Sequence, residues 1–183
     1  MTLVGVKFKW WTGENLRNDG EPFWVGKGEV PRHMINACGC TGLLNLIRRR
    51  NNLSIPGMDD PHNDFPGGTR IWFDYLCKNT IMFYGEIIRY DATKTYAKGT
   101  ILMRPYTNIY NQGHVAIVCT DNNEIIHSYP NIVEIPFPED SINPGVIVEP
   151  IEKSHKEWID HNQDFSIDGY YQFAFPPESW LIQ

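Results

Sequence analysis

The chain has 183 residues, of which 42% are hydrophobic and 13% aromatic, and this composition suits one folded domain over 1–183 with its own core. Its net charge of -6 and pI of about 5.5 argue against a nucleic acid or an anionic membrane as the main partner. No stretch reaches the roughly 20 apolar residues of a membrane span. Lysines interrupt the apolar start of the chain, so we expect no signal peptide and a cytoplasmic protein by default, although packaging or non-classical export would also fit. The four cysteines are too few for a disulfide-stapled secreted fold.

Periodicity and turn residues predict helices in the first half of the chain and strands in the second. The first half reads, in order, as a strand over 3–11, a loop over 12–28, a helix from Cys40 that ends at Asn51-Asn52, a loop over 54–68, and a short helix over about 70–78. Residues 81–97 are ambiguous between helix and strand. Short strands follow at 100–103, 114–119, 124–129, 146–149 and 170–175. Helices followed by an antiparallel sheet predict an α+β fold.

The helix that begins at Cys40 contains the first candidate for chemistry. Leu43, Leu44 and Ile47 recur at helical spacing, so Cys40 lies at the positive end of the helix dipole. Backbone N–H groups at such an end favour a thiolate and can lower a cysteine pKa from about 8.5 towards neutrality. The run Arg48 to Arg50 suits the negative end of the dipole, and we expect it to be a solvated helix end. The alternative for Cys40 is a buried cysteine in the core at the helix start.

The other three cysteines are weaker candidates. Cys38 competes with Cys40 for the role of nucleophile, but only Cys40 is followed by the Thr-Gly-Leu-Leu segment that places it at the helix start. Cys38, Cys40 and His33 could form a zinc site, although a Cys-x-Cys pair lacks the usual ligand gap of two to four residues. Cys77 and Cys119 follow apolar runs, so we expect them to be core thiols. We expect no metal and no organic cofactor.

Two histidines lie in the predicted sheet, and a catalytic thiol needs a base and a group that orients the base. His114 opens one strand and His127 closes the next, and a tight hairpin would join the two. A turn at Thr120-Asp121 places them directly opposite, and a turn at Asp121-Asn122 makes them diagonal neighbours on one face, about 7–8 Å apart. A turn of odd length without a bulge would place them on opposite faces. Period-2 geometry therefore permits a histidine pair without requiring it.

Several motifs occur in the order found in one known family. The matching segments are Pro22 to Gly26, Cys40-Thr41-Gly42-Leu43-Leu44, Gly99 to Met103, Gly113-His114-Val115-Ala116-Ile117-Val118 and Ile125-Ile126-His127-Ser128. Together they resemble the NlpC-type papain-like cysteine peptidases, which are peptidoglycan endopeptidases, and the resemblance covers about residues 23–128. CHAP amidases share this order and are close competitors. Gly39 and Thr100 replace acidic residues of the family pattern, and Phe23 replaces a tyrosine. The long interval from Cys40 to His114 implies an insertion at about 52–98.

The resemblance implies a papain-like α+β fold, with the cysteine-bearing helix packed on the sheet. It also implies a thiol hydrolase in which Cys40 is the nucleophile, His114 the base and His127 the orienting residue. The implied substrate is an amide or isopeptide bond, typically in a cell-wall peptide. Two alternatives remain: a non-catalytic papain-like module that binds or supports other molecules, and an acyltransferase or deamidase that acts on protein or lipid.

Overall fold

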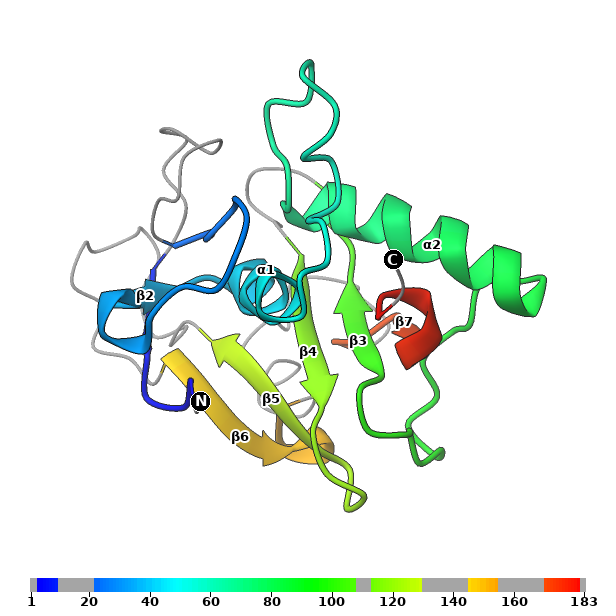
Figure 1. Ribbon diagram of the computed structural model, residues 1–183. Helices are drawn as coiled ribbons and strands as arrows, with labels where there is room; N and C mark the ends of the chain where they lie inside the picture. The colour runs from blue at the N-terminus through cyan, green and yellow to red at the C-terminus, as the bar shows by residue number, and fades with distance from the viewer. Residues whose placement is uncertain (1–2, 10–21, 108–112, 130–144, 155–169, 182–183) are drawn as a thin grey trace. The chain divides into compact units, whose positions relative to one another are not determined.

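The computed structural model describes residues 3–9, 22–107, 113–129, 145–154 and 170–181. The chain divides into two compact units. Residues 1–72, 127–147 and 183 form the first unit, and residues 73–126 and 148–182 form the second. The prediction of an α+β fold is confirmed, because helices precede an antiparallel sheet along the chain (Figure 1).

The sheet contains five strands in the order β6-β5-β4-β3-β7 (Figure 1). Their bounds are β3 Ile101–Arg104, β4 His114–Val118, β5 Glu124–Tyr129, β6 Gly145–Pro150 and β7 Phe173–Phe175. β3 pairs antiparallel with both β4 and β7, and β4 pairs antiparallel with β5. The predicted positions of these five strands are confirmed, with ends that shift by at most three residues.

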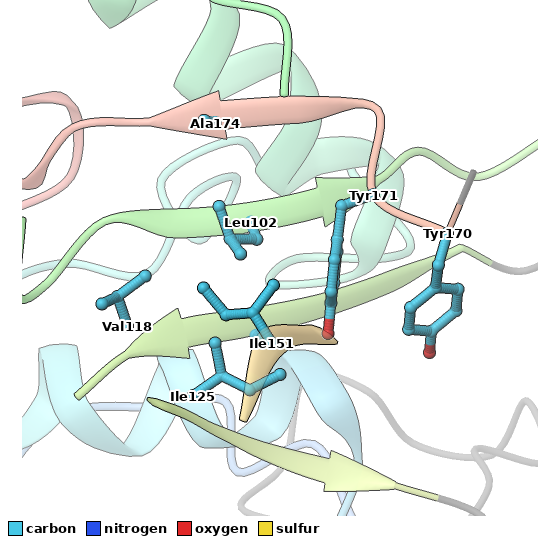
Figure 2. Close-up of a cluster of buried hydrophobic side chains, with 8 residues drawn as sticks. Leu102, Val118, Ile125, Ile151, Tyr170, Tyr171 and Ala174 are labelled. Carbon is cyan, nitrogen blue, oxygen red and sulfur yellow. The ribbon is translucent and has the colours of Figure 1, made fainter. Parts of the chain in front are cut away.

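In the second unit, one face of the sheet buries a cluster of apolar and aromatic side chains (Figure 2). The cluster comprises Leu102, Ala116, Val118, Ile125, Ile151, Tyr170, Tyr171 and Ala174. Leu102 stands opposite Ala116 on one side and Ala174 on the other. These small neighbours leave room for large side chains above β3, and each large side chain fully buried contributes about 1.5–3 kcal/mol.

Helix α2 spans Thr69–Tyr84 and is longer than the predicted helix over 70–78. Asn79 and Thr80 have low helix propensity, but their side chains bond to the C-terminal segment. Asn79 donates to the Ser179 carbonyl at 2.9 Å, and the Thr80 and Ser179 hydroxyls are 2.7 Å apart. These buried bonds offset the propensity cost, so the helix continues to Tyr84.

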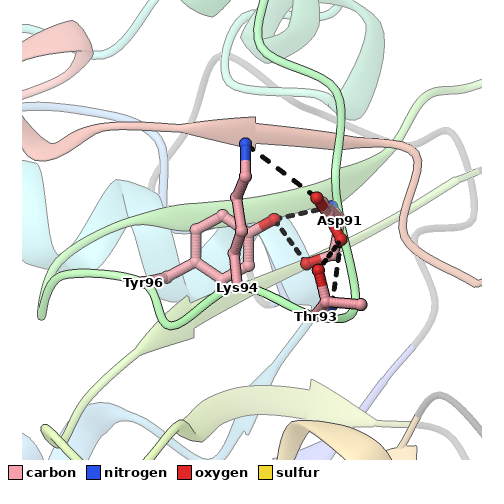
Figure 3. Close-up of polar contacts among 4 residues, drawn as sticks. All are labelled: Asp91, Thr93, Lys94 and Tyr96. Atoms are coloured by element: carbon pink, nitrogen blue, oxygen red, sulfur yellow. Dashed lines mark hydrogen bonds and ion pairs between the residues drawn. The ribbon is translucent and has the colours of Figure 1, made fainter.

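The ambiguous segment after α2 is mainly a loop, with one isolated bridge between Arg89 and Phe173. A turn centred on Asp91 organises it (Figure 3). Thr93 donates to the Asp91 carboxylate from both its backbone N–H and its hydroxyl, at 2.9 and 2.6 Å, and these bonds lower the pKa of Asp91. The Tyr96 hydroxyl donates to the Asp91 carbonyl at 3.0 Å. The segment is therefore fixed by local polar contacts rather than by regular structure.

In the first unit, the short strand β1, Lys7–Phe8, pairs in parallel with β2, Ala37–Cys38. The residues before β1 also bond to the start of β6: Gly5 N–H donates to the Val146 carbonyl at 2.9 Å, and Val146 N–H donates to the Val6 carbonyl at 2.8 Å. A side chain at Gly145 would overlap the Val6 carbonyl, so this approach requires glycine. Of the predicted strand over 3–11, only Lys7–Phe8 forms, and residues 10–11 lie outside the described part.

Candidate functional site

Cys40 is the first residue of helix α1, which spans Cys40–Arg50, as predicted. Gly39 is the N-cap and has extended backbone angles, and the Leu43 N–H donates to its carbonyl at 3.2 Å. Cys40 is partly exposed, and all four cysteines are free of disulfides. A thiol in this position experiences the positive end of the helix dipole, which stabilises a thiolate.

Cys38 differs from Cys40 in its surroundings. It is fully buried, and its Sγ lies 3.3 Å from the Gly39 carbonyl oxygen, to which it donates. Burial raises the pKa of the Cys38 thiol far above its ordinary value, and the neighbouring Cys40 adds to the increase. A protonated, inaccessible thiol is a poor nucleophile, so the structure favours Cys40 in the competition between the two.

The prediction that Cys77 and Cys119 are core thiols is wrong, because both are partly exposed. Partial burial is nevertheless the main cause that raises the pKa of Cys77 to about 11, and the charge of Asp74 adds to the increase. Partial burial also raises the pKa of Cys119, and the charge of Glu124 is the second cause of the increase. Neither thiol is therefore activated for nucleophilic attack at neutral pH.

The segment Pro22–Gly28 lies along one face of α1. The Pro22 carbonyl accepts the Gly39 N–H at 3.0 Å, and a side chain at Gly42 would overlap that carbonyl oxygen. Farther along the helix, the fully buried Asn45 donates to the Phe23 carbonyl at 2.8 Å. The segment over 22–28 is therefore fixed beside the first turns of the cysteine-bearing helix.

Asn45 joins three segments of the first unit. Besides the Phe23 carbonyl, its amide N–H group reaches the Gly67 carbonyl at 3.3 Å, and its amide oxygen accepts the Trp72 indole N–H at 2.8 Å. Because its N–H group and its oxygen are both bonded, the buried Asn45 amide stabilises one particular arrangement of these segments. Asn45 thus fixes the loop over 54–68 and the start of α2 relative to α1.

The prediction of a solvated helix end at Arg48 to Arg50 is wrong for two of the three arginines. Arg48 and Arg49 are buried, and only Arg50 is exposed. Arg48 donates to the Ser54 carbonyl at 2.6 Å, and Arg49 donates to carbonyls of the segment over 24–28. Buried guanidinium groups are tolerated here because backbone carbonyls supply their acceptors.

The β4–β5 hairpin has the register of a turn with an even number of residues. Ile117 pairs with Ile126 and Val118 with Ile125, and Cys119 N–H donates to the Glu124 carbonyl at 2.8 Å. This is the register that a turn at Asp121-Asn122 produces. In this register, positions 114 and 127 fall on the same face of the hairpin as diagonal neighbours. This is one of the alternatives that the sequence left open.

His114 is the first residue of β4 and is almost fully buried. Its ring stacks on Tyr170 with the centroids 5.2 Å apart, and the Tyr171 ring lies 6.4 Å away. Arg104 stands directly opposite His114 on β3, and its guanidinium carbon is 5.3 Å from the centre of the Tyr170 ring. The sequence predicts a last aromatic strand over 170–175, but it did not indicate that Tyr170 and Arg104 would surround His114.

His127 lies on β5 and is fully buried. Its neighbour Ser128 donates its hydroxyl to the Cys38 carbonyl at 2.6 Å, two residues before Cys40. Because adjacent residues of a strand point to opposite faces, the Ser128 side chain, rather than the His127 imidazole, lies on the side of β5 that meets Cys38. Cys40 and His127 belong to the first unit, and His114 belongs to the second.

Among the described residues, no three His, Cys, Asp or Glu side chains are grouped in a way that could hold a metal ion. No helix in the part of the chain that the structure describes is long and apolar enough to cross a membrane. A comparison with protein-family models finds no match for the chain, and a comparison with curated proteins finds none either.

Proposed function

We propose that the chain is a thiol hydrolase that cleaves an amide or isopeptide bond, with Cys40 as nucleophile, His114 as general base and His127 as the residue that orients the base. The observation that carries this proposal is the position of Cys40, partly exposed at the first residue of an 11-residue helix. The resemblance to NlpC-type peptidases adds the substrate class, a stem peptide of the cell wall.

In this scheme His114 accepts the proton of the Cys40 thiol, and the resulting thiolate attacks the carbonyl carbon of the scissile bond. The Cys40 N–H helps to stabilise the tetrahedral oxyanion. The base then protonates the leaving amine, and water hydrolyses the thioacyl enzyme.

A second candidate is a non-catalytic papain-like module. One observation favours it: the Ser128 hydroxyl, and not the His127 imidazole, lies on the side of β5 that meets Cys38. A fully buried histidine on the other side of the strand would then be a core residue.

The test is incubation of the purified protein with defined muropeptides, ubiquitin-like isopeptides and lipid amides, with the products identified by mass. A Cys40→Ala variant is the matched control for every product. Release of a fragment that carries a diamino acid supports the wall-peptide reading, and turnover of another class alone rejects it. No Cys40-dependent turnover of any substrate favours the non-catalytic module.

The role of His127 is tested separately. If His127 orients the base, His127→Asn should retain part of the activity, because an amide oxygen accepts the same hydrogen bond, whereas His127→Ala should lose far more. His114→Ala should lose about as much as Cys40→Ala, since members of a catalytic unit are not additive. A folded His127→Ala variant with full turnover would leave a Cys40–His114 dyad.

A further inference from the structure

Ser128 is a fully buried hydroxyl with a short, directional contact in the first unit. Its Oγ donates to the Cys38 carbonyl oxygen at 2.6 Å, across 90 residues of sequence. This distance is at the short end for O–H···O hydrogen bonds. The contact therefore ties β5 to the backbone that leads directly into Cys40.

The peptide unit that receives this bond is held at both of its polar ends. The Cys38 carbonyl accepts from Ser128, and the Gly39 N–H of the same peptide donates to the Pro22 carbonyl at 3.0 Å. A peptide unit is planar, so two bonds in opposite directions fix the rotation of its plane.

The next peptide unit contains the Cys40 N–H. Its carbonyl, from Gly39, accepts the Leu43 N–H at 3.2 Å and the Cys38 thiol at 3.3 Å. Gly39 itself has extended angles, φ -80° and ψ 172°, between the two peptides. The direction of the Cys40 N–H thus depends on the peptide that Ser128 holds.

We infer that Ser128 is a positioning residue: by holding the Cys38–Gly39 peptide, it aims the Cys40 N–H at the oxyanion that forms during acyl transfer. This inference rests on the proposed role of Cys40 as nucleophile. Donors to an oxyanion act only when they are correctly placed before the reaction. Loss of the Ser128 hydroxyl should therefore slow reactions that form an oxyanion and spare those that do not.

Two small reagents distinguish, at the Cys40 thiolate, a reaction that forms an oxyanion from one that does not. With p-nitrophenyl acetate, the Cys40 thiolate adds to the carbonyl, the oxyanion forms and collapses, and p-nitrophenolate leaves an S-acetyl cysteine. With iodoacetamide, the same thiolate displaces iodide and no oxyanion forms. Rates at Cys40 are followed by peptide mapping, in the wild type and in Ser128→Ala. Ser179→Ala is the matched control, because it removes another fully buried hydroxyl, bonded to Thr80 in the second unit.

Ser128→Ala should slow acetylation of Cys40 by about 10- to 100-fold and leave its alkylation rate unchanged. Ser179→Ala should change neither rate. Thermal melting confirms that each variant is folded, and Ser128→Cys, which keeps the volume but donates weakly, replaces the alanine variant if that one does not fold. It should show the same selective slowing.

An unchanged ratio of acetylation to alkylation in the folded Ser128 variant overturns the inference. A parallel fall in both rates also overturns it, because that pattern means a change in the thiolate and not in the oxyanion donor. If wild-type Cys40 reacts with neither reagent ahead of the other cysteines, the proposed nucleophile itself is wrong. The two failures are therefore distinguishable.

Discussion

Replacement of Arg49 by methionine should destabilise the first unit severely. Its guanidinium donates to four backbone carbonyls, those of Gly28 at 2.7 Å, Lys27 at 2.9 Å, and Trp24 and Val25 at 3.3 Å each. Methionine keeps most of the side-chain volume but leaves these acceptors without the donor. Hydrogen bonds from charged groups contribute about 1.5–3 kcal/mol each, but bonds from one side chain are not additive.

We therefore expect a loss of about 3–5 kcal/mol, as when one member of a buried charged network is removed. Such a loss is a large part of the 5–15 kcal/mol typical of a folded protein, and it corresponds to a fall in Tm of about 6–20 °C. Urea unfolding and thermal melting measure it. The matched control is Arg50→Met, because the exposed Arg50 side chain forms a long ion pair with Glu29, with Nε and Oε1 3.9 Å apart. Its replacement should lose less than about 1 kcal/mol. Equal stability of the two variants would refute the reasoning.

Three further predictions follow from the start of α1. Limiting iodoacetamide near pH 7 should label Cys40 before Cys38, as read by peptide mapping, and preferential labelling of Cys38 would contradict the assignment of the nucleophile. Gly42→Ala should destabilise the protein by about 1–3 kcal/mol in urea unfolding, because the new methyl group overlaps the Pro22 carbonyl. Gly39→Ala meets only ordinary contacts at 3.6 Å or more and should be tolerated, so equal losses would refute the argument. Since burial raises the pKa of Cys38, only the unfolded thiol ionises above about pH 8.5. Stability should therefore fall as the pH rises past that value, with a shallower slope in Cys38→Ala, and identical slopes would exclude Cys38 as the cause.

The sequence predicted helices and strands well where apolar spacing and turn residues within a few positions determine the element. The helix starting at Cys40 and the strand Glu124–Tyr129 have the expected bounds, because apolar spacing and turn residues act within a few positions. The end of α2 was predicted too early, because Asn79 and Thr80 are poor helix formers. Their compensating bonds come from Ser179, which is distant in sequence.

The candidate site was harder to predict, because its contacts also join residues that are distant in sequence. Charge alone indicated that Arg48 and Arg49 face solvent, since nothing in the local sequence shows that backbone carbonyls will surround them. Ser128 carries no sequence signal, because its partner, the Cys38 carbonyl, is 90 residues away. The position of Cys40 at the helix start was predictable because it depends only on the residues that follow it.

The contact between the N-terminal residues and the start of β6 affects how the protein is made. Gly5 and Val6 leave the ribosome about 140 residues before their partner Val146. At about 5–20 residues per second, this partner arrives on the order of ten seconds later. The first unit also includes residues 127–147, so it cannot complete its fold on the N-terminal segment alone. The nascent chain therefore carries an open strand edge, of the kind that chaperones cover, until Val146 has been synthesised.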